Sequence, residues 1–251
     1  PMKKTTLFLV IGLFLVFALS SIQTVETLSV RAKPEKPPGK PDKPTDPTPD
    51  PEPEPGTGDG VIRKWALVIG ISNYEGTSSD LTYCDDDARD WASYLQGEGY
   101  NVDLLIDAQA DADGIYNAFM QLAANEDGDD LVAITYSGHG YYERSIRESC
   151  LVSQDLYLLP ASEFKTITDT FESSQIFMFL DCCNAGTFST IVGSGWVAGI
   201  GSTKSSYTYD GTSAMKNGIY TYYAMEAIAN GYFYAEDICD YAAAYFNAAT
   251  P

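Results

Sequence analysis

Apolar residues between positions 61 and 250 follow two alternating patterns. Short, nearly continuous apolar runs predict buried strands, and longer segments with apolar residues three or four positions apart predict helices. The predicted strands are KWALVIGI (64–71), NVDLLID (101–107), DDLVAITYS (129–137), DLYLLP (155–160), QIFMFLD (175–181) and GWVAGIGST (195–203). The predicted helices are 85–100, 112–126, 161–173, 218–231 and 235–248. This stretch of roughly 190 residues is long enough for one domain with its own core.

Two of the predicted helices have a clear apolar face. In the first, the apolar positions follow the spacing i, i+3, i+4, i+7, and they are Ala88, Trp91, Ala92 and Leu95. In the second, they are Ile115, Ala118, Phe119 and Leu122. The aspartates at 85–87 favour a helix N-terminus, because the helix dipole is positive at that end.

Strands that alternate with helices of this length predict βαβ units and a mainly parallel sheet with helices on both faces. The strands are apolar throughout, as expected when both of their faces are buried. In such α/β sheets, ligands bind beyond the carboxyl ends of the strands. His139 and the pair Cys182–Cys183 each come just after a predicted strand, so we expect them at this functional edge.

The first 60 residues are not expected to belong to the domain. Residues 2–21 combine a basic start, an apolar run from Leu7 to Leu19 and small residues, which is typical of a secretory signal peptide. The run is shorter than the roughly 20 residues that a membrane span needs, so an uncleaved anchor is the weaker alternative. Residues 32–60 are rich in proline and predict an extended linker. We therefore expect an exported domain at 61–250, secreted or tethered to the cell surface.

The charge of the chain limits its partners. Its formal net charge is −20, which argues against nucleic acid as a ligand and permits basic peptides or cations. We expect contact with a membrane only through an uncleaved N-terminal segment.

The cysteines offer chemistry but no metal site. Five cysteines in an exported chain leave at least one thiol free or bridged to another molecule. There is no C-x-x-C pair and only one histidine, which argues against structural zinc.

His139 is the one histidine that could activate a thiol near neutral pH. Flanking glycines would let the backbone turn sharply and approach a substrate closely. The backbone N–H groups of Gly140 and of the cysteine could stabilise a developing oxyanion, and attack on an acyl carbon would give an acyl-enzyme. The competing interpretations are a structural histidine and cysteines that only fill the core. A Ser-His-Asp triad is disfavoured, because no G-x-S-x-G segment follows a strand.

Three motifs resemble those of caspase-like cysteine peptidases, in particular metacaspases and prokaryotic caspase homologues (peptidase family C14). These motifs are YSGHG (136–140), DCCNAG (181–186) and LTYCDDDARDW (81–91). The resemblance implies a caspase-hemoglobinase-like three-layer sandwich around a mainly parallel six-stranded sheet. It also implies peptide-bond hydrolysis by a dyad of His139 as base and Cys183 as nucleophile, with no required cofactor.

The resemblance further implies an acidic pocket that accepts arginine or lysine before the cleaved bond. The residues in the pocket positions are Cys84, Asp87, Ser137 and Asp181. Carboxylates there would pair with a guanidinium or an ammonium group. Alternatively, Asp87 only favours the helix N-terminus and Asp181 only makes a hydrogen bond at the strand end.

The chain departs from the family pattern in two places. Asn184 and Ala185 replace the usual His-Ser after the nucleophile, a change we expect to affect loop packing. Calcium-binding metacaspases carry an aspartate-rich segment after the histidine, whereas this chain has only Glu143, Glu148 and Asp155 there. We therefore expect no calcium dependence through that segment, and a regulatory calcium ion bound elsewhere stays an open alternative.

Lys204 and Lys216 lie in a polar loop beyond the nucleophile and are candidate sites of self-cleavage. Two other functions remain open: a non-catalytic caspase-like binding or assembly module, and a redox pair formed by Cys182 and Cys183. The redox pair is disfavoured, because adjacent cysteines can form only a strained ring. Side chains alternate at a strand end, so only one of the two cysteines can readily face His139. The motif resemblance selects Cys183, and Cys182 would then point into the core.

Overall fold

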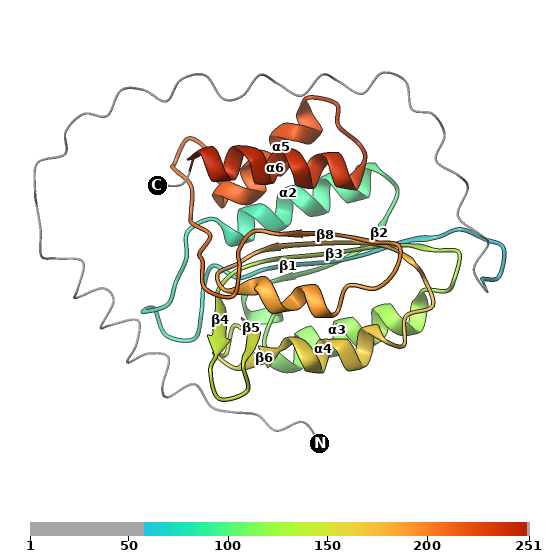
Figure 1. Ribbon diagram of the computed structural model, residues 1–251, viewed down its shortest axis with the longest axis horizontal. Coiled ribbons are helices and arrows are strands. Elements are labelled where there is room, and N and C mark those ends of the chain that lie inside the picture. The colour runs from blue at the N-terminus through green and yellow to red at the C-terminus, as the bar shows by residue number, and fades with distance from the viewer. Residues whose placement is uncertain (1–57, 250–251) are drawn as a thin grey trace, which may run out of the picture.

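The computed structural model describes residues 58–249, which include nearly all of the predicted domain (Figure 1). The predicted signal peptide (2–21) and all but the last three residues of the predicted linker (32–60) lie outside the described residues. Between residues 58 and 249, no helix combines the length and the apolar composition that crossing a lipid bilayer requires.

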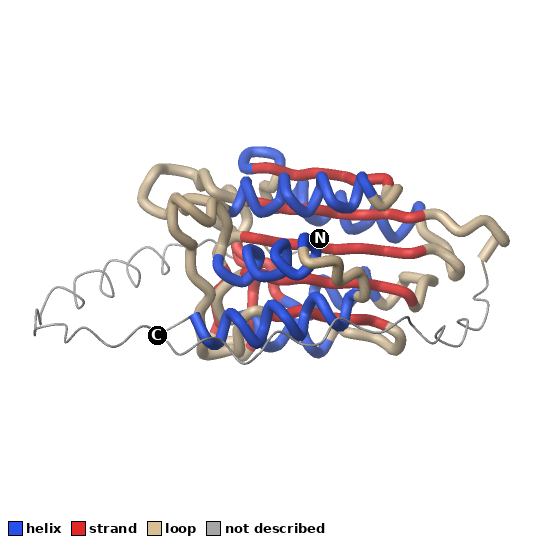
Figure 2. The backbone as a smooth tube through the Cα atoms, turned by 90° about the horizontal axis from the view of Figure 1, so that it is seen from above, coloured by secondary structure: helices blue, strands red, loops and turns tan. Residues whose placement is uncertain are grey.

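The centre of the domain is a parallel sheet with the strand order β2-β1-β3-β7-β8. The strands are β1 (Lys64–Gly70), β2 (Asn101–Ile106), β3 (Leu131–Ser137), β7 (Gln175–Asp181) and β8 (Trp196–Ile200). Every pairing is parallel, as the alternation of strands and helices predicts. Seen from above in Figure 2, the strands lie side by side and loops gather beyond one end of them.

The expectation of a six-stranded central sheet needs correction. The described part of the chain supplies five strands to this sheet. After β8 the chain enters a polar, Ser/Gly-rich segment and then two helices, so no further apolar run adds to the sheet. The edge strand β2 is also less apolar than the others. Alternate β2 residues are exposed, because only one neighbouring strand and part of a helix cover them.

Helices cover both faces of the sheet (Figure 1). On one face lie α2 (Cys84–Gly97), α5 (Ile219–Ala229) and α6 (Ala235–Ala249), and on the other lie α3 (Ala112–Asn125) and α4 (Ala161–Thr168). The apolar faces predicted for the first two helices are buried as expected, and they lie on α2 and α3. Each helix therefore packs its apolar stripe against one face of the sheet, which gives the predicted three layers.

A second, antiparallel sheet follows directly after His139. It consists of β4 (Gly140–Glu143), β5 (Glu148–Val152) and β6 (Leu158–Pro160). The strand expected over 155–160 is shorter than predicted, and β4 and β5 were not predicted at all. Two residues of β5, Cys150 and Leu151, are almost completely buried in the core.

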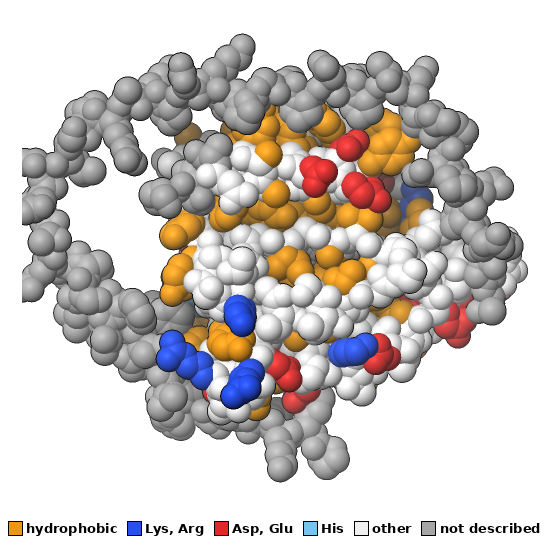
Figure 3. Space-filling model, viewed as in Figure 1, with side chains coloured by type: hydrophobic (Ala, Val, Ile, Leu, Met, Phe, Trp, Pro, Cys, Tyr) orange, Lys and Arg blue, Asp and Glu red, His pale blue; other side chains and the backbone are white. Residues whose placement is uncertain are grey.

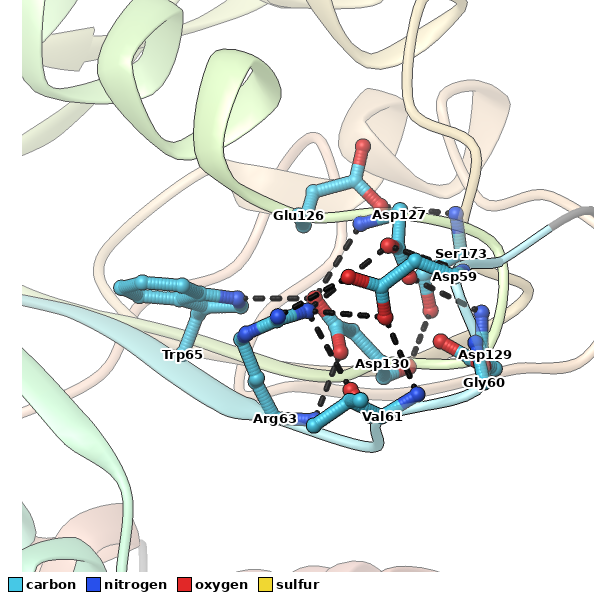
Figure 4. A network of polar contacts seen from close by, with 10 residues as sticks. All are labelled: Asp59, Gly60, Val61, Arg63, Trp65, Glu126, Asp127, Asp129, Asp130 and Ser173. Carbon is cyan, nitrogen blue, oxygen red and sulfur yellow. Dashed lines mark hydrogen bonds and ion pairs between the residues drawn. The ribbon is translucent and has the colours of Figure 1, made fainter.

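The described chain enters the sheet at the start of β1, at the end of the parallel strands opposite to their carboxyl ends. A network of polar contacts surrounds this start (Figure 4). The Arg63 N–H donates to Asp130 Oδ1 at 2.6 Å, and the Trp65 indole N–H donates to Asp130 Oδ2 at 2.9 Å. Gly60 N–H donates to Asp129 Oδ2 at 2.8 Å. These hydrogen bonds fix the start of β1 beside the loop that precedes β3.

On the face drawn in Figure 3, basic side chains are few and gather mainly where the β4–β5 hairpin lies. The acidic character of the chain, with a net charge of −20, therefore leaves little positive surface on this side.

Candidate active site

The predicted site residues meet because β3 and β7 end together. Ser137, the last residue of β3, pairs with Asp181, the last residue of β7. His139 and Cys183 each follow two residues later, so both reach the same cavity of about 350 Å³. The predicted pocket residues Cys84, Ser137 and Asp181 also line this cavity, as does Gly140.

Two tyrosines and a carbonyl group hold His139 in place. Its backbone N–H donates to the Tyr74 hydroxyl at 2.7 Å, and its carbonyl accepts from the Tyr136 hydroxyl at 2.8 Å. The ring Nε2 lies 2.8 Å from the carbonyl oxygen of Ser79. Because a carbonyl oxygen only accepts, Nε2 must carry the proton of the neutral ring, and Nδ1 becomes the nitrogen that can take a proton.

The two neighbouring cysteines differ as predicted. Cys182 is completely buried and belongs to the core on the α3 side of the sheet. Cys183 is partly exposed and lines the cavity, with its Sγ 3.6 Å from the carbonyl oxygen of Thr208. All five cysteines are free thiols. Cys183 is therefore the thiol that a substrate could reach.

Burial shifts the pKa values of both residues of the candidate dyad, His139 and Cys183. It lowers the pKa of His139 below its usual value, and it raises the pKa of the Cys183 thiol. Both shifts favour a neutral imidazole and a neutral thiol over an ion pair. A reaction through this thiol therefore requires a base to remove its proton.

The two glycines beside His139 allow very close packing. A Cβ atom on Gly140 would lie 1.9 Å from the Cys183 carbonyl oxygen, and one on Gly138 would lie 2.8 Å from the Tyr74 hydroxyl. No other residue fits at either position without shifting its neighbours. The proposed oxyanion donors, Gly140 and Cys183, are thus side by side, and their role stays a prediction.

Two carboxylates lie together behind the cavity. Asp87 Oδ2 accepts from the Ser137 hydroxyl at 2.6 Å, and its Oδ1 accepts from Gly218 N–H at 2.9 Å. Asp181 Oδ2 accepts from both the N–H and the hydroxyl of Thr221 at 2.9 Å. Both side chains are almost completely buried, but only Asp181 lines the cavity.

This burial makes both carboxylates costly to ionise. It raises the pKa of Asp87 well above its usual range, and the nearby charge of Asp181 raises it further. Burial also raises the pKa of Asp181, against the effect of the Thr221 hydrogen bonds. Burial and the proximity of the two groups therefore disfavour a negative charge on both of them at once.

The candidate self-cleavage residues are accessible. Lys204 and Lys216 are both exposed, in the segment of turns between β8 and α5. Neither of them lines the cavity. Asn184, which replaces the usual residue after the nucleophile, holds this segment with both backbone and side chain. Its backbone N–H donates to the Ser206 carbonyl at 2.9 Å, and its side-chain amide donates to the Lys204 carbonyl at 3.2 Å.

The residues considered for calcium have structural partners. Glu148 accepts from Ser162 N–H, Asp155 accepts from Ala112 N–H at the start of α3, and Glu143 accepts from Ser145 N–H. Among the described residues, one group of three carboxylates has the spacing of a metal site: Asp59, Asp127 and Asp129. It lies at the opposite edge of the sheet, where the Arg63 guanidinium already binds Asp59 at 2.9 Å.

Several cavity residues were not predicted from the sequence. Leu81 comes from the loop before α2 and Tyr141 from β4. The others come from the segment after β8, and they are Tyr207, Thr208, Tyr209, Asp210 and Gly218. Tyr74 and Ser79, which hold His139, were missed as well. The only available signal was that both loops connect the carboxyl end of a strand to the next helix, where ligands usually bind.

Residues 63–240 match the family described as "Caspase domain", peptidase family C14. This chain belongs to the caspase-domain family of peptidases. The resemblance to metacaspases is confirmed by two relatives. The chain is 27% identical to Metacaspase-4 of Arabidopsis thaliana over 143 residues, which cover 50% of this chain and 34% of the relative. It is 27% identical to Metacaspase-2 of Trypanosoma brucei brucei over 150 residues, covering 49% and 41%.

The match to these curated relatives therefore spans well under half of their length. A crystal structure of the protein GSU0716 from Geobacter sulfurreducens aligns with a TM-score of 0.55 at 16% identity, covering 68% of this chain and 84% of that one. This similarity supports the caspase-like α/β fold.

The accessibility of the thiols predicts selective alkylation. Iodoacetamide should modify only Cys183 in the folded protein, because the other four cysteines are buried. The rate should still be rising above pH about 8.5, since the thiolate reacts and burial raises the pKa of Cys183. Peptide mass mapping, with denatured protein as the fully labelled control, measures this. Equal labelling of a Cys183→Ala variant would contradict it.

The buried carboxylate Asp181 should lower stability at neutral pH. A group with a raised pKa in the folded state stabilises the fold while it is protonated, and this contribution is lost as the pH rises through that pKa. Asp181→Asn can keep an acceptor for Thr221. We therefore expect it to stabilise the fold at pH 8 by on the order of 1 kcal/mol. For a domain of this size, that change raises the Tm by roughly 2–4 °C. The gain should vanish near pH 3.

Thermal denaturation across this pH range tests the sign. Asp103→Asn, on the exposed edge strand β2, is the matched control and should leave the Tm unchanged at both ends. A gain in Tm that is largest at low pH would show that ionised Asp181 stabilises the fold.

Proposed function

We propose that this protein is a cysteine endopeptidase that cleaves after arginine or lysine. The observation that carries the proposal is the shared cavity. It contains one accessible thiol, Cys183, and one histidine, His139, whose Nε2 is tied to the Ser79 carbonyl. The caspase-domain family supports peptide-bond hydrolysis as the reaction class.

The proposed reaction uses these groups in sequence. His139 Nδ1 takes the thiol proton as the Cys183 sulfur attacks the carbonyl carbon of the scissile bond. The oxyanion then lies near the N–H groups of Gly140 and Cys183. As the C–N bond breaks, the imidazolium returns its proton to the leaving amine, which gives a thioester. His139 next activates a water molecule, and its attack releases the carboxylate product and restores the thiol. This sequence needs no metal or cofactor.

The carboxylates support the preference for basic residues. Asp181 lines the cavity beside the nucleophile, with Asp87 directly behind it. A guanidinium or ammonium group entering here would favour the ionised forms of both acids, which are disfavoured in the empty cavity. Cys84 and Ser137 complete the walls around this end of the cavity.

We also propose that the domain is exported and held on an N-terminal tether. The chain enters the domain at the edge opposite to the cavity, through the hydrogen bonds of Gly60 and Arg63 (Figure 4). A tether attached there would leave the cavity facing away from its anchor. This arrangement supports cleavage of substrates in the surrounding medium.

The two cysteines give the sharpest test of the reaction. Cys183→Ala should abolish hydrolysis of fluorogenic peptides ending in arginine or lysine, because the attacking atom is lost. Cys182→Ala should keep activity but lose about 1–3 kcal/mol of stability, since its thiol fills the core. The reverse result would move the nucleophile to Cys182.

The same assay separates the alternatives. Peptides with arginine, lysine, aspartate or asparagine before the cleaved bond are compared under reducing conditions, with and without calcium. Cleavage after aspartate alone would overturn the acidic pocket. The absence of all cleavage in both calcium conditions would favour a non-catalytic binding module.

Self-cleavage after Lys204 or Lys216 follows from their exposure beside the proposed site. On incubation, the wild-type protein should yield new N-termini at Ser205 or Asn217, identified by mass spectrometry. The Cys183→Ala protein should stay intact, and adding active enzyme should cleave it at the same bonds. Fragments of the same size from Cys183→Ala alone would point to a contaminating protease.

A further inference from the structure

A third carboxylate, Asp210, reaches the cavity from the segment after β8. It forms an isolated antiparallel bridge with Gly218. Hydrogen bonds on both sides hold this bridge, from Ile219 N–H to the Tyr209 carbonyl and from Gly211 N–H to the Asn217 carbonyl, each 2.9 Å long. Asp210 is therefore fixed opposite Gly218, the residue that lies against both buried carboxylates.

Asp210 differs from the two buried acids in accessibility. Asp87 does not line the cavity, and Asp181 is only 4% exposed, whereas Asp210 is an exposed residue on the cavity wall. Its Oδ2 accepts one hydrogen bond, from Thr82 N–H at 3.1 Å, and its Oδ1 accepts none from the part of the chain that the structure describes. This oxygen is available to a ligand.

The neighbours of Asp210 suit a long basic side chain. Tyr207 and Tyr209, which also line the cavity, are 50% and 45% exposed. Their rings can cover the aliphatic part of an arginine or lysine side chain while its charged end meets a carboxylate. Asp210 also acts electrostatically on the site. Burial is the main cause that raises the pKa of Asp181 and of Cys183, and the nearby charge of Asp210 contributes to both increases.

We propose that Asp210 is a specificity-determining residue, whose exposed carboxylate receives the charged end of the arginine or lysine side chain in the cavity. This inference rests on the proposed function. The carboxylate of Asp210 is accessible before any substrate has entered, whereas burial disfavours charge on Asp87 and Asp181. The basic side chain thus meets Asp210 first and then lies between it and Asp181.

Asp210 also has a positioning role through its second oxygen. The Thr82 N–H that it binds belongs to the loop before α2, and the same loop provides the Ser79 carbonyl that orients His139. The carboxylate therefore connects the pocket to the support of the catalytic base. Removing the oxygen should affect kcat, whereas removing only its charge should affect the preference for basic residues.

The test compares two peptides that differ only in charge, with arginine or its neutral analogue citrulline before the cleaved bond. Asp210→Asn keeps an oxygen for Thr82 N–H but loses the charge. The ratio of kcat/KM for arginine over citrulline should fall about 10- to 100-fold, the range for one charge-assisted hydrogen bond. Asp210→Ala should show the same fall in ratio and, in addition, a lower kcat for both peptides.

Asp86→Asn is the matched control, because it removes a charge from the first turn of α2 without touching the cavity. It should leave the ratio and both kcat values unchanged. The Tm of each variant confirms that it is folded. An unchanged ratio in a folded Asp210→Asn protein, in an enzyme that prefers arginine, would overturn this assignment alone. If the wild type cleaves neither peptide, the proposed function is wrong and the assignment falls with it.

Discussion

The site depends on the register between β3 and β7. Their parallel pairing places Ser137 opposite Asp181 at the common end of the two strands. Because side chains alternate along a strand, the residues two positions further on, His139 and Cys183, both reach one cavity. Cys182, between Asp181 and Cys183, stays in the core. A slip of one residue would turn Cys183 inward and bring Cys182 to the cavity, so the hydrophobic pattern of β7 indirectly selects the nucleophile.

Burial imposes the second constraint, because it penalises every charge that the proposed reaction needs. It disfavours the imidazolium of His139, the thiolate of Cys183 and the ionised forms of Asp87 and Asp181. These shifts disfavour charge on the four buried groups, whereas the exposed Asp210 lies on the wall of the same cavity. A bound cationic side chain would favour the ionised forms of the two carboxylates. The pocket would therefore become charged as it binds such a side chain. Under the proposed specificity, a basic substrate would thus supply the charge that favours the ionised pocket, while burial disfavours the thiolate of Cys183.

The sequence predicted those parts of the fold that follow from a regular spacing of apolar residues. The apolar stripes of α2 and α3, the parallel strands and the strand-end positions of His139 and Cys183 all follow from patterns of period two or 3.6. It overestimated the sheet by one strand and missed the β4–β5 hairpin, whose short strands are too mixed in polarity to form a clear pattern. The loops have no period at all, and for that reason the roles of Tyr74, Ser79 and Asp210 emerged only from the structure.

These loop residues bear on how the proposed dyad would work without a third catalytic carboxylate. The Ser79 carbonyl accepts the proton-bearing Nε2 of His139, which fixes the tautomer that a base needs. A carbonyl carries no full charge, so it orients the ring without stabilising the imidazolium as strongly as a carboxylate would. Burial lowers the pKa of His139, and the hydrogen bond to the Ser79 carbonyl and, to a smaller degree, the charge of Asp210 both oppose that effect. The Ser79 carbonyl therefore orients the ring and also contributes to stabilising its charged form, Asp210 adds to that stabilisation from a second loop, and the hydrogen bond from Thr82 to Asp210 joins the two loops.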